Sequence, residues 1–218
     1  MQTFSEENYL KIVYNLDKQG LKKITPTAIA EALNNNPASV VDMIKKLVDK
    51  KLLQYEKTKG VKLTEKGKNI AIQIVRKHRL WEVFLAEKLG YGWDEVHDMA
   101  EQLEHVQHAE LADKLDKFLG FPSYDPHGDP IPKANGETAV TYKTLLAEVA
   151  AGKSCKVVAV KDTSPSFLQY LKKLDIGIGT KITLIEKIPF DNSIIIMIGK
   201  STKTTVSKVF AENLLVHE

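Results

Sequence analysis

The stretch VHDMAEQLEHVQH (residues 96–108) concentrates acids and imidazoles at helical spacing. Read as one helix, it places its acid and imidazole residues on a single stripe: His97, Glu101, Glu104, His105 and His108. There is no Lys or Arg from His97 to His108. Carboxylates and imidazoles without a basic partner repel one another unless a cation lies between them. The stripe therefore predicts a site for a divalent metal ion.

The metalloenzyme motifs that use the same residue types are missing from this stretch. Asp98 follows His97, so there is no HExxH, and Gln102 stands three residues before His105, so there is no Glu-x-x-His. The chain also has no glycine-rich phosphate loop and no Ser or Cys in a nucleophile context. We expect no catalysis and no small organic substrate. Two alternatives remain open: a metalloenzyme with an appended winged helix, and an interaction module that binds no metal.

Composition and charge indicate a soluble protein with two kinds of charged partner. Of 218 residues, 43% are hydrophobic, and no apolar run is long enough for a transmembrane helix. The single cysteine, Cys155, excludes an intrachain disulfide, and we expect a cytoplasmic protein without a membrane partner. Residues 1–79 hold 16 basic and 8 acidic residues, whereas residues 80–137 hold 4 and 13. A basic first third favours a polyanion and an acidic middle favours metal cations.

The first third reads as a helix-turn-helix. Ser5 is a plausible N-cap for SEENYLKIVYNL, Thr25 for the helix of PTAIAEAL, and Asn36 for the helix that starts at Pro37. Two short helices joined by a polar turn place the second one in the DNA major groove. The run LLQYEKTKGVKLT then predicts a β-hairpin wing with a Lys-rich turn at Gly60.

This arrangement predicts which residues meet operator DNA, by analogy with other winged helices. Residues at the start of the second helix lie near base edges, and residues in the caps and the wing lie near phosphates. The predicted DNA-binding residues are Thr25, Thr27, Asn35, Asn36, Ala38, Ser39, Asp42, Met43, Lys45, Lys46, Lys57 and Lys59.

The middle third predicts three helices and a subunit interface. A long helix runs from Thr64 to about Gly90, with His78 and Glu82 one turn apart, and a third helix follows His108. Apolar residues of the long helix, Trp81 and Phe84 among them, cover more than one face. We therefore expect a homodimer, which suits the reading of palindromic DNA by paired helices. Beyond the Pro-rich linker 120–137, a short helix in TYKTLLAEVA and β-branched runs predict a small SH3-like barrel, with SIIIMIG as an inner strand.

Three motifs in order resemble a known family: RKHRLWEVFL (76–85), VHDMAEQLEH (96–105) and PHGDPIP (126–132). They resemble the diphtheria toxin repressor and manganese transport regulator family of metal-dependent transcriptional repressors, in its three-domain form. The resemblance implies an α+β protein with a winged helix-turn-helix domain at 1–63, a helical metal-binding and dimerisation domain at 64–137, and an SH3-like domain at 138–218. It also implies that metal-uptake genes are the regulated ones.

The resemblance further implies two metal ions per subunit. Its primary site would comprise Asn8, Glu101, Glu104 and His105. Its second site would draw on the long helix, the PHG loop and the last domain: His78, Glu82, His97, Asp125, His127 and Asp162. Lys11 stands where some manganese-responsive members have a Glu. An oxygen- and nitrogen-only first shell with Glu101 favours Mn²⁺, with Fe²⁺ as the alternative.

Overall fold

The computed structural model describes residues 2–108, 110–142 and 144–218, and the chain divides into two compact units. The first unit comprises Met1–His78, Glu101–Leu115 and Pro132–Glu137, and the second comprises Arg79–Ala100, Asp116–Ile131 and Thr138–Glu218.

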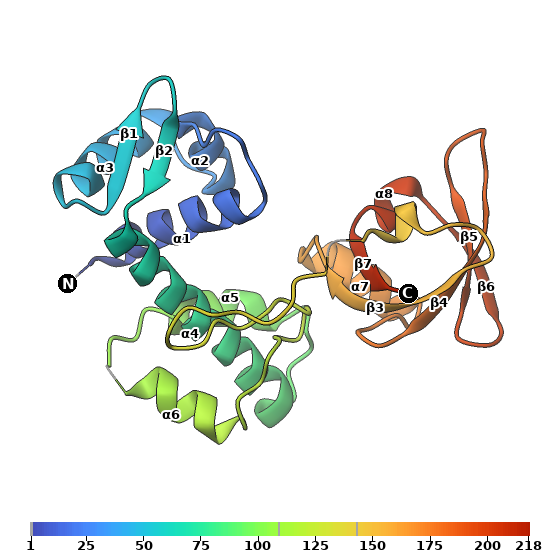
Figure 1. Ribbon diagram of the computed structural model, residues 1–218. Coiled ribbons are helices and arrows are strands. Elements are labelled where there is room, and N and C mark those ends of the chain that lie inside the picture. Colours follow the sequence, from blue (N-terminus) through green and yellow to red (C-terminus); the bar gives the residue numbers. More distant parts are fainter. Residues whose placement is uncertain (1, 109, 143) are drawn as a thin grey trace. The chain divides into compact units, whose positions relative to one another are not determined.

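The first unit begins with three helices and a hairpin, the expected winged helix-turn-helix. Its elements are α1 (Phe4–Lys18), α2 (Pro26–Ala32), α3 (Pro37–Asp49), β1 (Leu53–Glu56) and β2 (Gly60–Leu63). The two strands pair antiparallel, with Gln54 opposite Lys62. Figure 1 shows the hairpin beside α2 and α3, with α1 beneath them. Apolar side chains from all three helices are fully buried between them: Leu10, Ile29, Ile44 and Leu47.

Local sequence sets the ends of these helices. The Thr25 hydroxyl accepts from the Ala28 N–H at 3.1 Å and the Asn36 side chain from the Ala38 N–H at 2.8 Å, each with Pro in the first helical turn. These caps were expected. For α1, however, the expectation of Ser5 was wrong: Thr3 is the N-cap, and it forms a capping box with Glu6. Thr3 is the cap rather than Ser5 because Thr3 and Glu6 each accept a hydrogen bond from the backbone N–H of the other, so two amide groups are satisfied.

Gly60 is the residue that lets the wing turn. Its φ is +83°, and a Cβ there would lie 2.5 Å from the carbonyl oxygen of Ile24. The adjacent Val61 N–H donates to that same carbonyl at 2.8 Å, so the hairpin is fixed against the segment that precedes α2.

The helices of the middle third are shorter than their periodicity predicts, except for the first. α4 runs from Glu65 to Leu89, as expected. α5 covers only Val96–Leu103, so Glu104 and His105 lie in the turn after it and His108 lies beyond. The prediction of one helix through residue 108 was therefore wrong. α6 spans Leu111–Phe118.

The second unit contains the small β-domain, a five-stranded antiparallel sheet in the order β6-β5-β4-β3-β7. Its strands are β3 (Ser154–Val160), β4 (Lys181–Lys187), β5 (Ile194–Ile198), β6 (Thr202–Val206) and β7 (Leu214–His217). β5 pairs on both sides, which confirms SIIIMIG as an inner strand. Buried aliphatic residues such as Leu168, Ile182 and Ile196 form its core.

Two short helices and one 3-10 turn complete this domain. The sequence pattern did not predict α7 (Pro165–Lys173), although this helix starts as α2 and α3 do: Ser164 caps it and Pro165 follows. It also missed α8 (Lys208–Ala211). The helix expected in TYKTLLAEVA is reduced to the 3-10 turn η1 (Leu146–Glu148). The expected α+β fold class is confirmed by the family matches reported below. None of the described helices is long and apolar enough to cross a membrane.

Candidate metal centre

Donor atoms from α1 and from the end of α5 meet inside the first unit. Glu104 is fully buried and His105 is 7% exposed, whereas the Glu101 side chain keeps 34% of its surface accessible. His105 Nε2 lies 3.7 Å from Glu104 Oε1. The turn that ends α5 after Leu103 therefore brings a carboxylate and an imidazole nitrogen close together.

The His105 ring is oriented by α1. Its Nδ1–H donates to a Glu7 carboxylate oxygen at 2.6 Å, and the Phe4 ring stacks on it at 4.6 Å. Because Nδ1 carries the proton, the lone pair is on Nε2, the nitrogen that faces Glu104. A carboxylate behind an imidazole is the usual support of a metal-binding histidine.

Glu104 is ionised because cations and donors surround it. His78 Nδ1 donates to Glu104 Oε2 at 2.7 Å, and Lys11 Nζ lies 2.7 Å from Oε1 and 2.9 Å from Oε2. Lys11 Nζ also contacts Glu101 Oε1. Burial raises the pKa of Glu104, but the contacts with His78 and Lys11 outweigh burial and hold the pKa below its ordinary value.

Asn8 contributes a buried oxygen to this unit. Its Oδ1 is buried and accepts no hydrogen bond from any residue that the structure describes. Leaving a buried acceptor unsatisfied costs about 1–3 kcal/mol, which a bound cation would offset. Asn8 stands one turn before Lys11 on α1, so the two side chains leave the same face. The carboxylates, imidazole and amide oxygen of this unit therefore suit a divalent cation.

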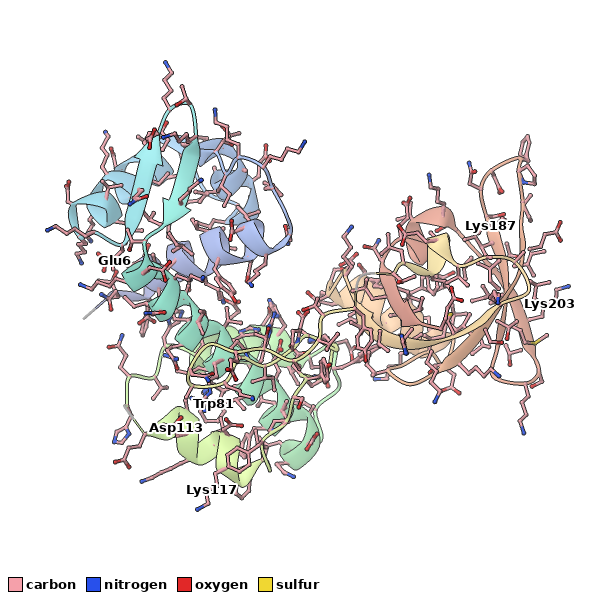
Figure 2. All side chains as sticks on the ribbon, in the orientation of Figure 1. Glu6, Trp81, Asp113, Lys117, Lys187 and Lys203 are labelled. Atoms are coloured by element: carbon pink, nitrogen blue, oxygen red, sulfur yellow. The ribbon has the colours of Figure 1, made fainter. Side chains whose placement is uncertain are left out.

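The first turn of α1 also holds α3. Glu6 is fully buried, and its Oε1 lies 2.9 Å from Lys46 Nζ and 2.7 Å from Lys50 Nζ. Burial alone would raise the pKa of Glu6. The two lysines and the Thr3 amide outweigh burial and lower the pKa to about 2. Neighbouring residues of one helix thus contact both the donor cluster and the helix expected in the major groove. Figure 2 labels Glu6 beside the start of α1.

A second cluster lies in the second unit and is equally buried. Glu82, Asp125 and His127 each present one ligand atom, and these three atoms lie within 4.8 Å of one another. His127 Nε2–H donates to the Trp93 carbonyl at 2.8 Å, and its Nδ1 faces Glu82 Oε2 at 3.6 Å. His97 Nδ1 lies 3.3 Å from Glu82 Oε1.

The PHG loop is fixed by its own acid and by β3. Asp125 Oδ1 accepts from the backbone N–H groups of His127 (2.8 Å) and Asp129 (3.0 Å), and the Val160 N–H donates to the His127 carbonyl. Gly128 has φ +87°, and a Cβ there would overlap the Val158 carbonyl oxygen at 2.1 Å.

Charge is tightly coupled in this second cluster. Burial and the nearby Glu82 raise the pKa of Asp125, while burial lowers the pKa of His127 but its contacts with Glu82 and Asp125 raise it overall. Arg79 Nε approaches Asp125 Oδ2 at 3.5 Å. Within this cluster the two buried acids face the His127 imidazole and the Arg79 guanidinium, which offset their negative charge.

The structure groups the predicted ligands differently from the sequence in two respects. His78, expected in the second set, contacts Glu104 of the primary set. Asp162 is not part of the group formed by Glu82, Asp125 and His127 within the described chain; its Oδ1 accepts from the Ser164 N–H at 2.8 Å at the start of α7. Sequence analysis missed Glu7 and Glu6 as supports, because nothing local connects residue 7 with residue 105.

The predicted DNA-contacting residues lie mainly on the exposed surface of α3, its cap and the wing. Asn36, Ala38, Ser39, Asp42 and Lys45 are exposed, whereas Met43 is half-buried. Thr25 is half-buried because it caps α2, and Thr27 and Asn35 are exposed. Lys57 and Lys59 of the wing are exposed, and Lys46 is ion-paired with Glu6.

Comparison with known proteins gives three consecutive family matches. The models match "Iron dependent repressor, N-terminal DNA binding domain" at residues 1–61, "Iron dependent repressor, metal binding and dimerisation domain" at 64–133, and "FeoA domain" at 144–218. The chain is 30% identical to the iron-dependent repressor IdeR of Mycobacterium leprae over 91% of this chain and 90% of that protein.

Other similar proteins divide between iron and manganese. The iron-dependent repressor IdeR of Mycobacterium bovis is 36% identical over 58% of this chain, and the match spans only 54%, about half, of that protein's length. A solved structure described as a manganese-dependent transcriptional repressor in complex with manganese has a TM-score of 0.88 and 31% identity, and the match covers 97% of this chain and 98% of that one.

Proposed function

Since the chain belongs to the iron-dependent repressor family, we propose that it is a homodimeric transcriptional repressor that binds palindromic operator DNA when it holds Mn²⁺ or Fe²⁺. The observation that carries this proposal is the buried Asn8 Oδ1, which accepts no hydrogen bond from the residues that the structure describes and lies on the helix that also contacts α3.

The primary ion would be held by Asn8, Glu101, Glu104 and His105. When bound, a divalent ion supplies positive charge that joins donors of α1 to donors at the end of α5. Two carboxylates, an imidazole and an amide oxygen suit Mn²⁺ or Fe²⁺, and the absence of a thiolate from this set favours Mn²⁺. The second ion would be held by Glu82, Asp125 and His127, with His97 beside Glu82.

Residues of α1 connect the primary metal site to α3, the helix that we propose enters the DNA major groove. Glu7 fixes His105, Asn8 contributes its oxygen, and Glu6 binds Lys46 of α3 and Lys50, the C-cap of that helix. A change in how firmly α1 is held at the end of α5 therefore changes how firmly α3 is held. The metal ion can drive this switch only if it binds more tightly to the protein with α1 held firmly at the end of α5 than to the protein with α1 held loosely. A coupling of about 1–3 kcal/mol gives roughly 5–150-fold tighter operator binding.

DNA recognition is assigned to the exposed start of α3 and to the wing. Ser39 and Asp42 would meet base edges, and Lys57 and Lys59 would meet phosphates. The balance of +8 over residues 1–79 supports a polyanion partner, because each neutralised phosphate releases counterions.

Dimerisation is assigned to an aromatic surface of the second unit. Trp81 and Phe84 pack edge to face at 5.7 Å, and Phe84 contacts Phe118 at 6.2 Å. Phe118 is 65% exposed and Phe121 66% exposed, an unusual arrangement for a monomer. We propose domain boundaries of 1–63 for DNA binding, 64–137 for metal binding and dimerisation, and 138–218 for the SH3-like domain.

The experiment is a titration of a palindromic metal-uptake promoter fragment with the full-length protein. Mn²⁺, Fe²⁺ (anaerobic) and Zn²⁺ are compared with a chelator control and with a scrambled DNA of equal length. We expect retardation of the specific fragment only with metal, and the order of half-saturating concentrations identifies the preferred ion. Equal binding in chelator and in metal would contradict the proposal.

A further inference from the structure

One cation already stands in the primary donor cluster, and it is part of the chain. The Lys11 side chain is 7% exposed, and its ammonium contacts both oxygens of Glu104 and one oxygen of Glu101. The lysine reaches these acids from α1, whereas both acids lie on or just after α5. The two contacts span 90 and 93 residues of sequence, so they form a tertiary link rather than a local ion pair.

The Lys11 ammonium contacts the carboxylate oxygen of Glu104 that a metal ion would need as a ligand. Glu104 Oε1 is 2.7 Å from Lys11 Nζ and 3.7 Å from His105 Nε2. An ion shared by His105 and Glu104 would have to approach this same oxygen. The ammonium and a divalent ion at this distance repel each other, so they cannot share the oxygen without a large loss of affinity.

The same contact makes the metal-free cluster stable. Without Lys11, Glu101 and Glu104 would repel each other, and the fully buried Glu104 would lose one of its two cationic or donor partners, Lys11 and His78. Lys11 neutralises one of the two negative charges and ties α1 to the end of α5, which is the link assigned above to the bound ion.

We propose that Lys11 is a tethered counter-cation that sets the metal threshold of the primary site: it holds α1 to Glu101 and Glu104 without metal, and an incoming divalent ion must displace it. This inference rests on the proposed function, since it concerns the same site. It makes Lys11 a residue that tunes metal affinity rather than a metal ligand.

The test compares Lys11→Gln, Lys11→Arg and Lys114→Gln in the full-length protein. Lys114 is a matched control because it also pairs with an acid, Glu110 at 2.8 Å, but on the exposed surface of α6. All variants and their parent carry His127→Gln, which removes a donor from the second cluster. Mn²⁺ binding is then measured by calorimetry, and thermal unfolding is followed in chelator.

For Lys11→Gln we expect Mn²⁺ to bind at least about tenfold tighter than to the parent, because one repulsive interaction with the ion is gone. In chelator the same variant should unfold several degrees lower. Lys11→Arg keeps the charge and should stay near the parent in both measurements, as should Lys114→Gln. Unchanged Mn²⁺ affinity in Lys11→Gln would overturn the proposal.

The design separates this inference from the proposed function. If the parent and every variant fail to bind Mn²⁺, the metal site itself is wrong. If all bind it equally, only the role of Lys11 is wrong. If Lys11→Gln does not fold in chelator, then refolding on addition of Mn²⁺, with Lys11→Arg folded throughout, supports the proposal. Failure of Mn²⁺ to restore folding overturns it.

Discussion

The imidazole of His105 is held by the carboxylate of Glu7, with Nδ1 and the carboxylate oxygen 2.6 Å apart and both side chains 6% exposed. This contact determines which nitrogen of His105 faces Glu104, and it connects the turn after α5 to the first turn of α1. It is therefore a support of the candidate metal centre that does not itself need to touch the ion.

Replacing Glu7 with Gln should weaken metal binding without unfolding the protein. Gln keeps the size of the side chain but removes the negative charge that makes the His105 imidazole a stronger donor to a metal ion. We therefore expect about 10–100-fold weaker Mn²⁺ binding. The measurement is calorimetric titration. Asp17→Asn, at an exposed position of the same helix, is the control and should match the wild type. Wild-type affinity in Glu7→Gln would show that His105 does not depend on this contact.

Glu6 should make a pH-dependent contribution to stability. Its pKa of about 2 lies below the ordinary value of 4.5, so its contribution is complete above pH 4.5 and is lost as the pH falls toward 2. Glu6→Gln should lower the free energy of unfolding by about 1–2 kcal/mol at pH 7, since it removes charge-assisted bonds to two half-exposed lysines. Denaturant unfolding at several pH values measures this. A wild-type minus variant difference that does not shrink in acid would contradict the assignment.

The wing should contribute affinity for DNA but no sequence preference. Lys59 is exposed and near the tip of the β1–β2 hairpin. Lys59→Ala should weaken operator and scrambled DNA alike and reduce the slope of log affinity against log salt by about 0.9. Fluorescence anisotropy at several salt concentrations measures both quantities. Lys203→Ala, an exposed change on β6 labelled in Figure 2, should leave the slope unchanged. An unaltered slope in Lys59→Ala would remove the wing from the interface.

Cys155 should be inert in the folded protein. It is 3% exposed in the core of the β-domain, and burial together with the nearby Glu218 raises the pKa of its thiol to about 11. Since only the thiolate reacts, a thiol reagent at pH 8 should label the native protein far more slowly than the unfolded one. Rapid labelling of native protein would show that β3 opens readily.

The sequence predicts the elements well where the signal is local. The caps at Thr25 and Asn36 precede prolines, and the wing surrounds Gly60, so short-range chemistry fixes them. The periodicity of residues 96–108 failed to predict where α5 ends, because Glu104, in the turn after Leu103, is held by Lys11 and His78, which are distant in the sequence. Tertiary contacts decide that turn.

The sequence predicts the types of residue that form the candidate metal site, but not the residues of α1 that contact them. Acids and imidazoles at helical spacing mark Glu101, Glu104 and His105 directly. Glu7 and Lys11 become visible only when α1 lies against the end of α5, since about ninety residues separate each from its partner. A lysine among acids also reads as an ordinary surface charge until its burial is known.

The most direct test of the account is operator binding by Glu104→Gln in Mn²⁺ and in chelator, with Lys114→Gln as the control. Glu104 is the fully buried carboxylate that faces both Lys11 and His105. We expect Lys114→Gln to keep the metal response of the wild type and Glu104→Gln to bind the operator equally weakly with and without Mn²⁺. Near-normal activation of Glu104→Gln by Mn²⁺ would contradict the assignment of this cluster as the switch.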